Sequence, residues 1–163
     1  MRYFVTILVV SLFLPLAVLA NERPTETSFA LSYSDVDDVG ETAQIGGTLL
    51  VPFWERNLIG PAVSLSWNNP EEGEDFTGGG IGAAWEVNLF DGDSGPFIGA
   101  QALYITGDAA DVFEYAGTAM VGLKFGGSDS FVKAYVSRTR NFGVDEVDDF
   151  DSTDVNVGIG LRF

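Results

Sequence analysis

The sequence predicts an all-β protein, an eight-stranded antiparallel up-and-down barrel. Three observations predict it: eight segments that alternate between apolar and polar residues, connections that are alternately short and long, and strand charges that all share one face. A side-chain period of two is the pattern of a strand whose two faces meet different surroundings. No stretch of the mature chain has a convincing helical period.

The first 20 residues are predicted to be a signal peptide for Sec-type export. Arg2 supplies a positive start, residues 4–14 an apolar run, and residues 18–20 (VLA) a small-residue cleavage pattern. An uncleaved anchor is the alternative, but polar residues and a proline interrupt a run that barely reaches the roughly 20 residues of a spanning helix. The expected organisation is a signal peptide at 1–20, a short N-terminal segment at 21–26 and a barrel at 27–163.

Composition narrows the possible functions. The chain has no cysteine, so neither a disulfide nor a lipid attached to an N-terminal cysteine is available. The net charge of -16 argues against nucleic-acid binding, because nucleic-acid phosphates require a basic surface. No second apolar segment of helical transmembrane length follows the signal, so any membrane role has to come from strands.

In the first four predicted strands, apolar residues occupy every second position between turn residues. Pro61 lies inside the third, where it cannot donate to a ladder, and it is expected to mark a bulge or the true strand start. In chain order, these segments and their apolar residues are 27–35 (Phe29, Leu31, Tyr33), 42–52 (Ala43, Ile45, Leu49, Val51), 58–68 (Ile59, Val63, Leu65, Trp67) and 79–90 (Ile81, Ala83, Trp85, Val87, Leu89).

The last four predicted strands follow the same pattern. The clearest is the final one, DVNVGIGLRF, in which one face is wholly apolar and the other wholly polar or small. In chain order, these segments and their apolar residues are 96–106 (Ile98, Ala100, Ala102, Tyr104), 115–125 (Ala119, Val121, Leu123, Phe125), 130–140 (Val132, Ala134, Val136) and 154–163 (Val155, Val157, Ile159, Leu161, Phe163).

Short and long connections alternate strictly along the chain. The short ones are FWERN at 53–57, DGDSG at 91–95 and GGSD at 126–129, whereas the others are longer or far more acidic. In an up-and-down meander, this order places all short turns at one end of the barrel and all long loops at the other. Most of the 24 acidic residues fall in or beside the long loops.

The charged strand residues indicate which face is outside. Glu86, Lys124, Lys133 and Arg162 lie on the phase opposite to the apolar residues, together with many Gly, Ser, Thr, Asn and Gln residues. A water-soluble barrel would show the reverse arrangement. Small and polar residues suit the interior of a narrow barrel, while Ile, Val, Leu and Trp suit lipid. The sequence therefore predicts a transmembrane β-barrel with a polar lumen.

Aromatic residues near the strand ends support a membrane position. Tyr33, Trp67, Tyr104 and Tyr115 lie near the long-loop ends of their strands and point outward, as an interfacial girdle requires. At the other end the support is partial, and we interpret the exceptions as slips of phase at strand ends. The residues in phase are Phe53, Phe125 and Phe163, and those out of phase are Phe90, Phe97 and Phe131.

With an export signal, eight alternating strands, short turns opposite longer loops and a terminal aromatic residue, the chain resembles the small outer-membrane β-barrels of Gram-negative bacteria, of the OmpA and OmpX type. The resemblance implies a location in the bacterial outer membrane, in contact with lipid and lipopolysaccharide. In that family the last strand is a recognition signal for the barrel-assembly machinery. The residues that match the signal are Phe163, Leu161, Ile159, Val157 and Val155.

Two enzymes of this architecture, the lipid A deacylase and the lipid A palmitoyltransferase, resemble hydrolases that rely on a histidine with a serine partner. This chain has no histidine, so its serines lack their usual activator. An outer-membrane protease built from carboxylates and histidine is excluded by the same absence. We therefore expect no enzymatic activity and no cofactor.

The four charged strand residues are expected to form one lumenal layer near the short turns. The favoured interpretation is a salt-bridge network that plugs the barrel, because eight strands enclose only their own side chains and unpaired buried charge is costly. A gate or narrow ion path is the alternative. Glu86 is the only carboxylate of the set, so it is expected to meet Arg162, with help from Asn88, Tyr135, water or the terminal carboxylate.

The last long loop holds the weak candidates for a calcium site, and the acidic PEEGED and DVDD stretches are further ones. Hard cations need several oxygen ligands, which clustered carboxylates supply, but no EF-hand spacing is present. A solvated, repelling surface is the alternative, as is weak exchange with the divalent ions that bridge lipopolysaccharide phosphates. The candidates in the last loop are Asp145, Glu146, Asp148, Asp149 and Asp151.

Three functions remain open from the sequence. The leading one is a structural or surface-interaction protein of the outer membrane that presents acidic loops. The second is a narrow pore or small-solute permeability factor. The third is a soluble periplasmic barrel that binds a lipophilic ligand, which would require the two faces to be inverted.

Overall fold

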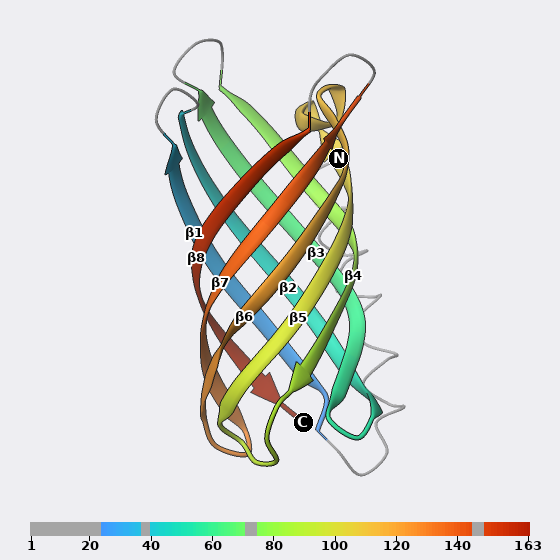
Figure 1. Cartoon of the computed structure of the whole chain (residues 1–163), viewed down its shortest axis with the longest axis vertical. Coiled ribbons are helices and arrows are strands. Elements are labelled where there is room, and N and C mark those ends of the chain that lie inside the picture. Colours follow the sequence, from blue (N-terminus) through green and yellow to red (C-terminus); the bar gives the residue numbers. More distant parts are fainter. Residues whose placement is uncertain (1–23, 37–39, 71–74, 145–148) are drawn as a thin grey trace.

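The computed structural model describes residues 24–36, 40–70, 75–144 and 149–163, so the predicted signal peptide lies outside the described residues. Eight antiparallel strands close into one barrel, each paired with its neighbours in sequence and the last with the first (Figure 1). The strands are β1 (Glu26–Val36), β2 (Gly40–Trp54), β3 (Asn57–Pro70), β4 (Phe76–Asn88), β5 (Gly95–Gly107), β6 (Phe113–Gly126), β7 (Ser130–Gly143) and β8 (Phe150–Arg162).

All eight predicted strands are confirmed, and each extends further than predicted at the same end of the barrel. For example, β8 begins at Phe150 rather than at Asp154, and β7 ends at Gly143 rather than at Arg140. The ladder continues there through polar residues that have lost the apolar alternation. Hydrogen bonding, which any backbone can make, therefore carries the strands beyond the amphipathic segments.

The two ends of the barrel differ as predicted. The connections after β2, β4 and β6 lie at the end that holds the C-terminus, at the bottom of Figure 1, and we call this the turn end. The other four connections lie at the opposite, loop end. One of them contains the short 3-10 helix η2 (Asp108–Asp111), whose Ala109 is buried.

The outward face is apolar, as predicted. On β8, Val155, Val157, Ile159 and Leu161 are each 56–70% exposed, and the corresponding residues of the other strands also lie on the surface. Leu49 is an exception, since it is buried although it lies on the outward phase of β2. The polar residues predicted to face inward are all buried or half-buried.

Pro61 does not begin β3, nor does the register shift at it, so the expectation for this residue was wrong. It lies inside the strand and pairs with Ala83 of β4. On the other side, the β2–β3 ladder pairs Thr48 with Ala62 and then Val51 with Ile59. The pairs between these positions are missing because proline has no N–H to donate. The barrel accommodates Pro61 by interrupting one ladder locally.

The lumen is less uniformly polar than the sequence predicts. A cluster of buried apolar side chains lies on one wall of it, from β2 to β6, with Ile105 packed against it. These residues lie at the inward-facing positions, among the serines and threonines. The sequence prediction followed the apolar residues at the outward-facing positions and therefore missed them. The cluster consists of Leu50, Leu58, Ala62, Ala84, Leu103 and Ala116.

Candidate functional site

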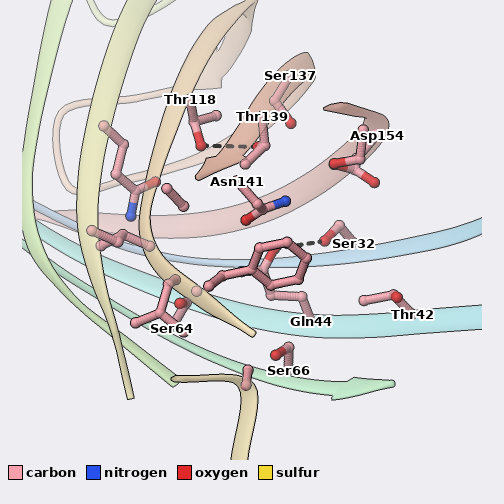
Figure 2. Close-up of a pocket in the computed structure, with 18 of the residues that line it drawn as sticks. Ser32, Thr42, Gln44, Ser64, Ser66, Thr118, Ser137, Thr139, Asn141 and Asp154 are labelled. Carbon is pink, nitrogen blue, oxygen red and sulfur yellow. Dashed lines mark hydrogen bonds between the residues drawn. The ribbon is translucent and has the colours of Figure 1, made fainter. Parts of the chain in front are cut away.

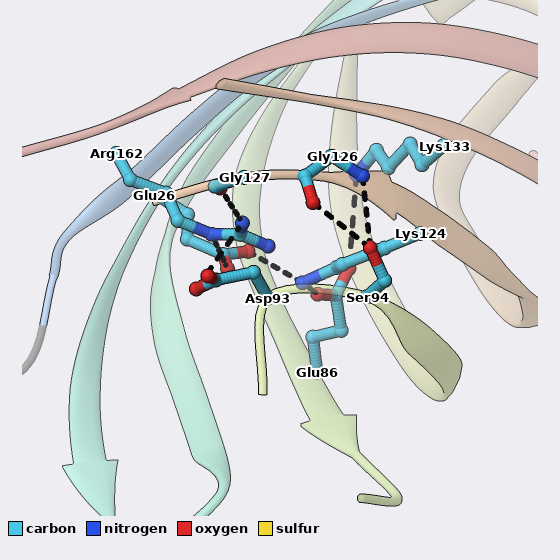
Figure 3. A network of polar contacts seen from close by, with 9 residues as sticks. All are labelled: Glu26, Glu86, Asp93, Ser94, Lys124, Gly126, Gly127, Lys133 and Arg162. Carbon is cyan, nitrogen blue, oxygen red and sulfur yellow. Dashed lines mark hydrogen bonds and ion pairs between the residues drawn. The ribbon is translucent and has the colours of Figure 1, made fainter. Parts of the chain in front are cut away.

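The lumen has two layers, and the one at the turn end contains ionised side chains (Figure 3). At the seam where β1 meets β8, Glu26 and Arg162 are directly opposite each other in the ladder. Arg162 Nε donates to Glu26 Oε1 at 2.9 Å, and Lys124 pairs with the other oxygen of the same carboxylate. An ion pair therefore links the first and last strands of the barrel.

Glu86 completes this layer from β4. It pairs with Lys124, and its second oxygen lies 3.7 Å from Lys133 Nζ. The two lysines are opposite each other on β6 and β7, where like charges repel. Glu86 offsets that repulsion by meeting both. We call Glu26, Glu86, Lys124, Lys133 and Arg162 the charge network; all five are between 2% and 8% exposed.

The structure brings together the four residues singled out in the sequence, with two differences. Arg162 pairs with Glu26 rather than with Glu86, and Glu26 itself was assigned to the N-terminal segment outside the barrel. Glu26 lies two positions before Ser28, which was predicted to face inward, so the alternation along β1 could have predicted that Glu26 faces inward as well. Asp93, in the turn after β4, lies 3.9 Å from Arg162 Nη1 and provides a third carboxylate for the three cations.

Phe97 and Phe131, which were out of phase with the outward aromatics, point into the lumen and pack against the charge network. The Lys124 Nζ lies 5.5 Å and 5.2 Å from the centres of their rings, and the Arg162 guanidinium lies 4.5 Å from that of Phe131. Such cation–π contacts favour a desolvated cation. These aromatics face the lumen and contact the charge network, so the interpretation of their positions as slips of phase was wrong.

The layer at the loop end is a cavity of about 400 Å³ (Figure 2). No residue of the charge network lines it. Tyr135 separates the two layers: it lines the cavity, and its ring packs edge-on against Phe97, with centroids 5.9 Å apart. Many of the lining side chains carry a hydroxyl or amide, including Ser32, Gln44, Ser64, Ser66, Gln101, Thr118, Ser137, Thr139, Asn141 and Asn156.

Hydrogen bonds between adjacent strands fix part of the cavity wall. The hydroxyls of Thr118 and Thr139 lie 2.9 Å apart, and the Asn156 amide donates to Ser137 Oγ at 2.9 Å. Apolar residues line the loop end of the cavity, among them Val112 and Phe113 beside η2. The cavity wall thus mixes hydroxyl and amide groups with apolar residues, among them Leu103, Ala116 and Met120.

The acidic candidates for calcium binding divide into two groups. Asp145, Glu146 and Asp148 lie outside the described residues. Asp149 and Asp151 form ion pairs with arginines of β7: Arg140 Nη2 lies 2.8 Å from Asp149 Oδ2, and Arg138 Nη2 lies 3.1 Å from Asp151 Oδ2. The Arg140 guanidinium and the Gly143 N–H lower the pKa of Asp149. Within the described part of the chain, no group of three or more His, Cys, Asp or Glu side chains is placed to hold a metal ion.

The aromatic residues at the loop end point outward, as predicted. Tyr33, Trp67, Tyr104 and Tyr115 are each 50–57% exposed. Tyr104 and Tyr115 are opposite each other on β5 and β6 and make an edge-to-face contact with centroids 5.6 Å apart. We call these four residues the loop-end girdle. No helix among the described residues is long and apolar enough to cross a membrane.

Solved structures share this architecture over nearly the whole chain. A crystal structure of neisserial surface protein A (NspA) matches with a TM-score of 0.57 at 14% sequence identity, covering 88% of this chain and 98% of that one. The chain has the fold of the small outer-membrane β-barrels. A transmembrane β-barrel designed de novo matches this outer-membrane barrel fold with a TM-score of 0.54 at 15% identity, covering 89% of this chain and 100% of the design.

A crystal structure of Ail, the attachment invasion locus protein of Yersinia pestis, matches with a TM-score of 0.49 at 14% identity, covering 89% of this chain and 100% of that one. No protein-family model and no curated protein sequence matches the chain. At these identities the similarity concerns the fold alone, so function has to be argued from the site.

Proposed function

We propose that the protein is an integral outer-membrane β-barrel, exported by the Sec route, with a sealed lumen and a structural or surface-interaction role rather than an enzymatic one. The observation that carries this proposal is the pairing of an apolar outer face with a buried charge network. Together these features match a molecule with lipid outside and ionised groups inside.

The outer face supports the membrane location. Large apolar residues cover all eight strands, whereas soluble monomers rarely expose contiguous apolar patches beyond a few hundred Å². The loop-end girdle lies at one edge of this band. At the other edge Phe53, Trp54, Phe90, Phe125 and Phe163 are exposed. Two aromatic belts around an apolar band are the pattern of a barrel that spans a bilayer.

The charge network supports a sealed lumen over the narrow-pore alternative. Its five side chains pair with one another and lie against the rings of Phe97 and Phe131, which are 0% and 4% exposed. An ion path would require hydrated charges, whereas these groups are shielded from water. Separating a buried ion pair leaves an unpaired buried charge, which is strongly destabilising. The closed arrangement of these side chains is therefore favoured over an open one.

The surroundings of the barrel are part of the proposal. Lipid and lipopolysaccharide would contact the outer face, and the barrel-assembly machinery would recognise Phe163 and the apolar residues before it on β8. The acidic loops would exchange weakly with divalent cations. The soluble alternative, a barrel for a lipophilic ligand, is disfavoured because it requires a polar exterior, whereas large apolar residues are exposed on every strand.

Conductance in planar lipid bilayers tests the sealed lumen. We expect the purified, refolded protein to insert without discrete conductance steps, because the charge network and its aromatic neighbours fill the turn end. The double variant Phe97→Ala/Phe131→Ala removes these neighbours, and it is expected to produce small, fluctuating currents. Thr118→Ala, in the loop-end cavity, is the matched control and is expected to remain silent.

Discrete steps from the unaltered protein that change with Glu86→Gln would contradict the sealed lumen and establish the narrow-pore alternative. Insertion has to be verified for each variant by the different gel mobilities of boiled and unboiled samples. Absence of conductance then indicates a closed barrel rather than a failure to insert.

A further inference from the structure

We propose that the loop-end cavity is a binding site for a small organic cation that carries ammonium groups, such as a linear polyamine. The sealed lumen proposed above depends on the charge network, which does not line this cavity. The cavity therefore has no part in that proposal. The inference rests on three observations: the volume of the cavity, the chemistry of its wall, and an acidic side chain in that wall that has no basic partner among the described residues.

The size of the cavity fits a small molecule. Its volume of about 400 Å³ lies within the range of roughly 300–1,000 Å³ that is usual for ligand pockets. It extends from Tyr135 and Met120, near the charge network, to Asn141 and Phe150 at the loop ends of β7 and β8. Because the charge network closes the turn end, a ligand would enter and leave from the loop side.

The wall offers acceptors for a donor-rich ligand. An ammonium group has three donors and no acceptor, so it needs several oxygens around it. The wall includes the carbonyl oxygens of Gln44, Gln101 and Asn141 and the hydroxyls of Thr118 and Thr139, which come from four strands, β2, β5, β6 and β7. Aromatic rings at Tyr135 and Phe150 add faces that attract cations.

Asp154 indicates that the ligand carries a positive charge. Its side chain lies on the inward phase of β8, is half-buried and lines the cavity (Figure 2). The Ser152 Oγ donates to its Oδ2 at 3.2 Å. No Lys or Arg among the described residues forms an ion pair with it, in contrast to Glu26 and Glu86. Among the described residues, no lysine or arginine lines the cavity, and Glu41 at its outer end adds a second acid.

Two carboxylates, those of Asp154 and Glu41, among hydroxyl and amide groups favour an ammonium over a metal ion. Calcium takes six to eight oxygen ligands, usually including several carboxylates, and no such group is found among the described residues. The net charge of -16 would raise the local concentration of any cation near the loops. That general attraction has to be separated from binding inside the cavity, and the test is designed for that purpose.

The test is isothermal titration of the refolded barrel in detergent with spermidine at fixed ionic strength. We expect saturable binding near one molecule per barrel, weakened about tenfold or more by Asp154→Asn. The matched control is Asp111→Asn, which removes the same charge from an exposed residue of η2 that does not line the cavity, and it is expected to change the affinity less than about twofold. Triethylene glycol, an uncharged chain with oxygens, is expected not to bind measurably.

Several outcomes would overturn the proposal. Equal weakening by the two variants would mean that spermidine senses only the overall charge. Absence of saturable binding, or equally tight binding of triethylene glycol, would reject the ligand class. Asp154→Asn preserves shape and is expected to fold, as gel mobility can verify. Thr118→Phe, which fills the cavity, gives a second check, since the folded variant is expected to lose spermidine binding.

Discussion

Glu26 and Arg162 face each other across the seam that closes the barrel, and their ion pair is buried. Arg162→Met leaves the Glu26 carboxylate without its cross-strand partner, so we expect the free energy of unfolding to fall by about 3–5 kcal/mol. Urea unfolding in lipid vesicles, followed by tryptophan fluorescence, measures this difference. Adding Glu26→Gln to Arg162→Met is expected to lower the free energy of unfolding further, because Lys124 and Lys133 then share the Glu86 carboxylate alone within the charge network.

The control for this prediction is Arg138→Met, which removes an arginine from an exposed ion pair with Asp151. Exposed pairs contribute about 0–1 kcal/mol, so this variant is expected to unfold almost like the unaltered protein. Similar losses for the two arginine variants would contradict the importance of the buried seam.

Gly160 of β8 lies against the ring of Phe131, where a side chain would intrude. A Cβ at this position would lie 2.7 Å from the Thr27 carbonyl oxygen and still closer to the Phe131 ring. We expect Gly160→Ala to lower the free energy of unfolding by about 1–3 kcal/mol, because overpacking moves Phe131 away from Arg162. Gly127→Ala is the matched control, since nothing lies within 4 Å of a Cβ there. Equal stability of the two variants in urea unfolding would contradict this packing.

For individual residues, the sequence predicted which side chains face the lumen but not which of them pair. The alternation of residues along each strand was enough to place Glu86, Lys124, Lys133 and Arg162 inside. The register that sets Glu26 opposite Arg162 depends on how the first and last strands meet, across 136 positions of sequence. No local pattern encodes that meeting, so Glu26 was missed even though its phase was correct.

Among the elements, β8 has two expected roles that experiments can separate: its backbone closes the barrel, and its terminal aromatic side chain is the predicted assembly signal. The backbone of Phe163 makes two hydrogen bonds with Thr25, of 2.8 Å and 3.1 Å, while its side chain is 57% exposed. Phe163→Ala keeps these bonds, so we expect refolding in vitro to be nearly unchanged. In cells, the amount of barrel in the outer membrane is expected to fall several-fold if the terminal aromatic is the assembly signal.

Quantitative blotting of outer-membrane fractions measures that effect, with Phe53→Ala as a control for loss of an exposed aromatic at the same end of the barrel. Unchanged assembly of Phe163→Ala, or an equal loss in both variants, would remove the special role of the terminus.

The loop ends of β7 and β8 are held together by ion pairs that depend on pH. The pKa of Asp149 is lowered from its ordinary value of 3.8, chiefly by hydrogen bonding to Arg140. A lowered pKa means that the pair is fully present above the ordinary value and is lost as pH falls through the folded-state value. We expect the Asp149 carboxyl to titrate below pH 3.8 by NMR, and to move upward in Arg140→Gln; an unchanged midpoint would contradict the pairing.

The strands themselves could be predicted almost completely, because alternation and turn residues report them directly. Their extensions at the loop end could not, since residues such as Asn141 and Phe150 pair without an apolar face to mark them. The cavity was missed for a related reason. It arises where small hydroxyl- and amide-bearing side chains fail to fill the lumen, which depends on the volumes of residues from several strands at once.

For the whole molecule, the central claim is that the apolar face meets lipid and the ionised face meets the lumen. The same amphipathic strands would fit a soluble barrel if the faces were inverted, so sequence periodicity alone could not decide between the two. The position of the charges decided it. All five members of the charge network lie inside, and large apolar residues are exposed on every strand.

The most direct test of this claim is fractionation of a Gram-negative host that exports the protein, followed by gel electrophoresis of boiled and unboiled samples. A barrel with its apolar face in lipid is expected entirely in the outer-membrane fraction, and to run at a different mobility when unboiled. Recovery in the soluble periplasm, with no change of mobility on boiling, would contradict it.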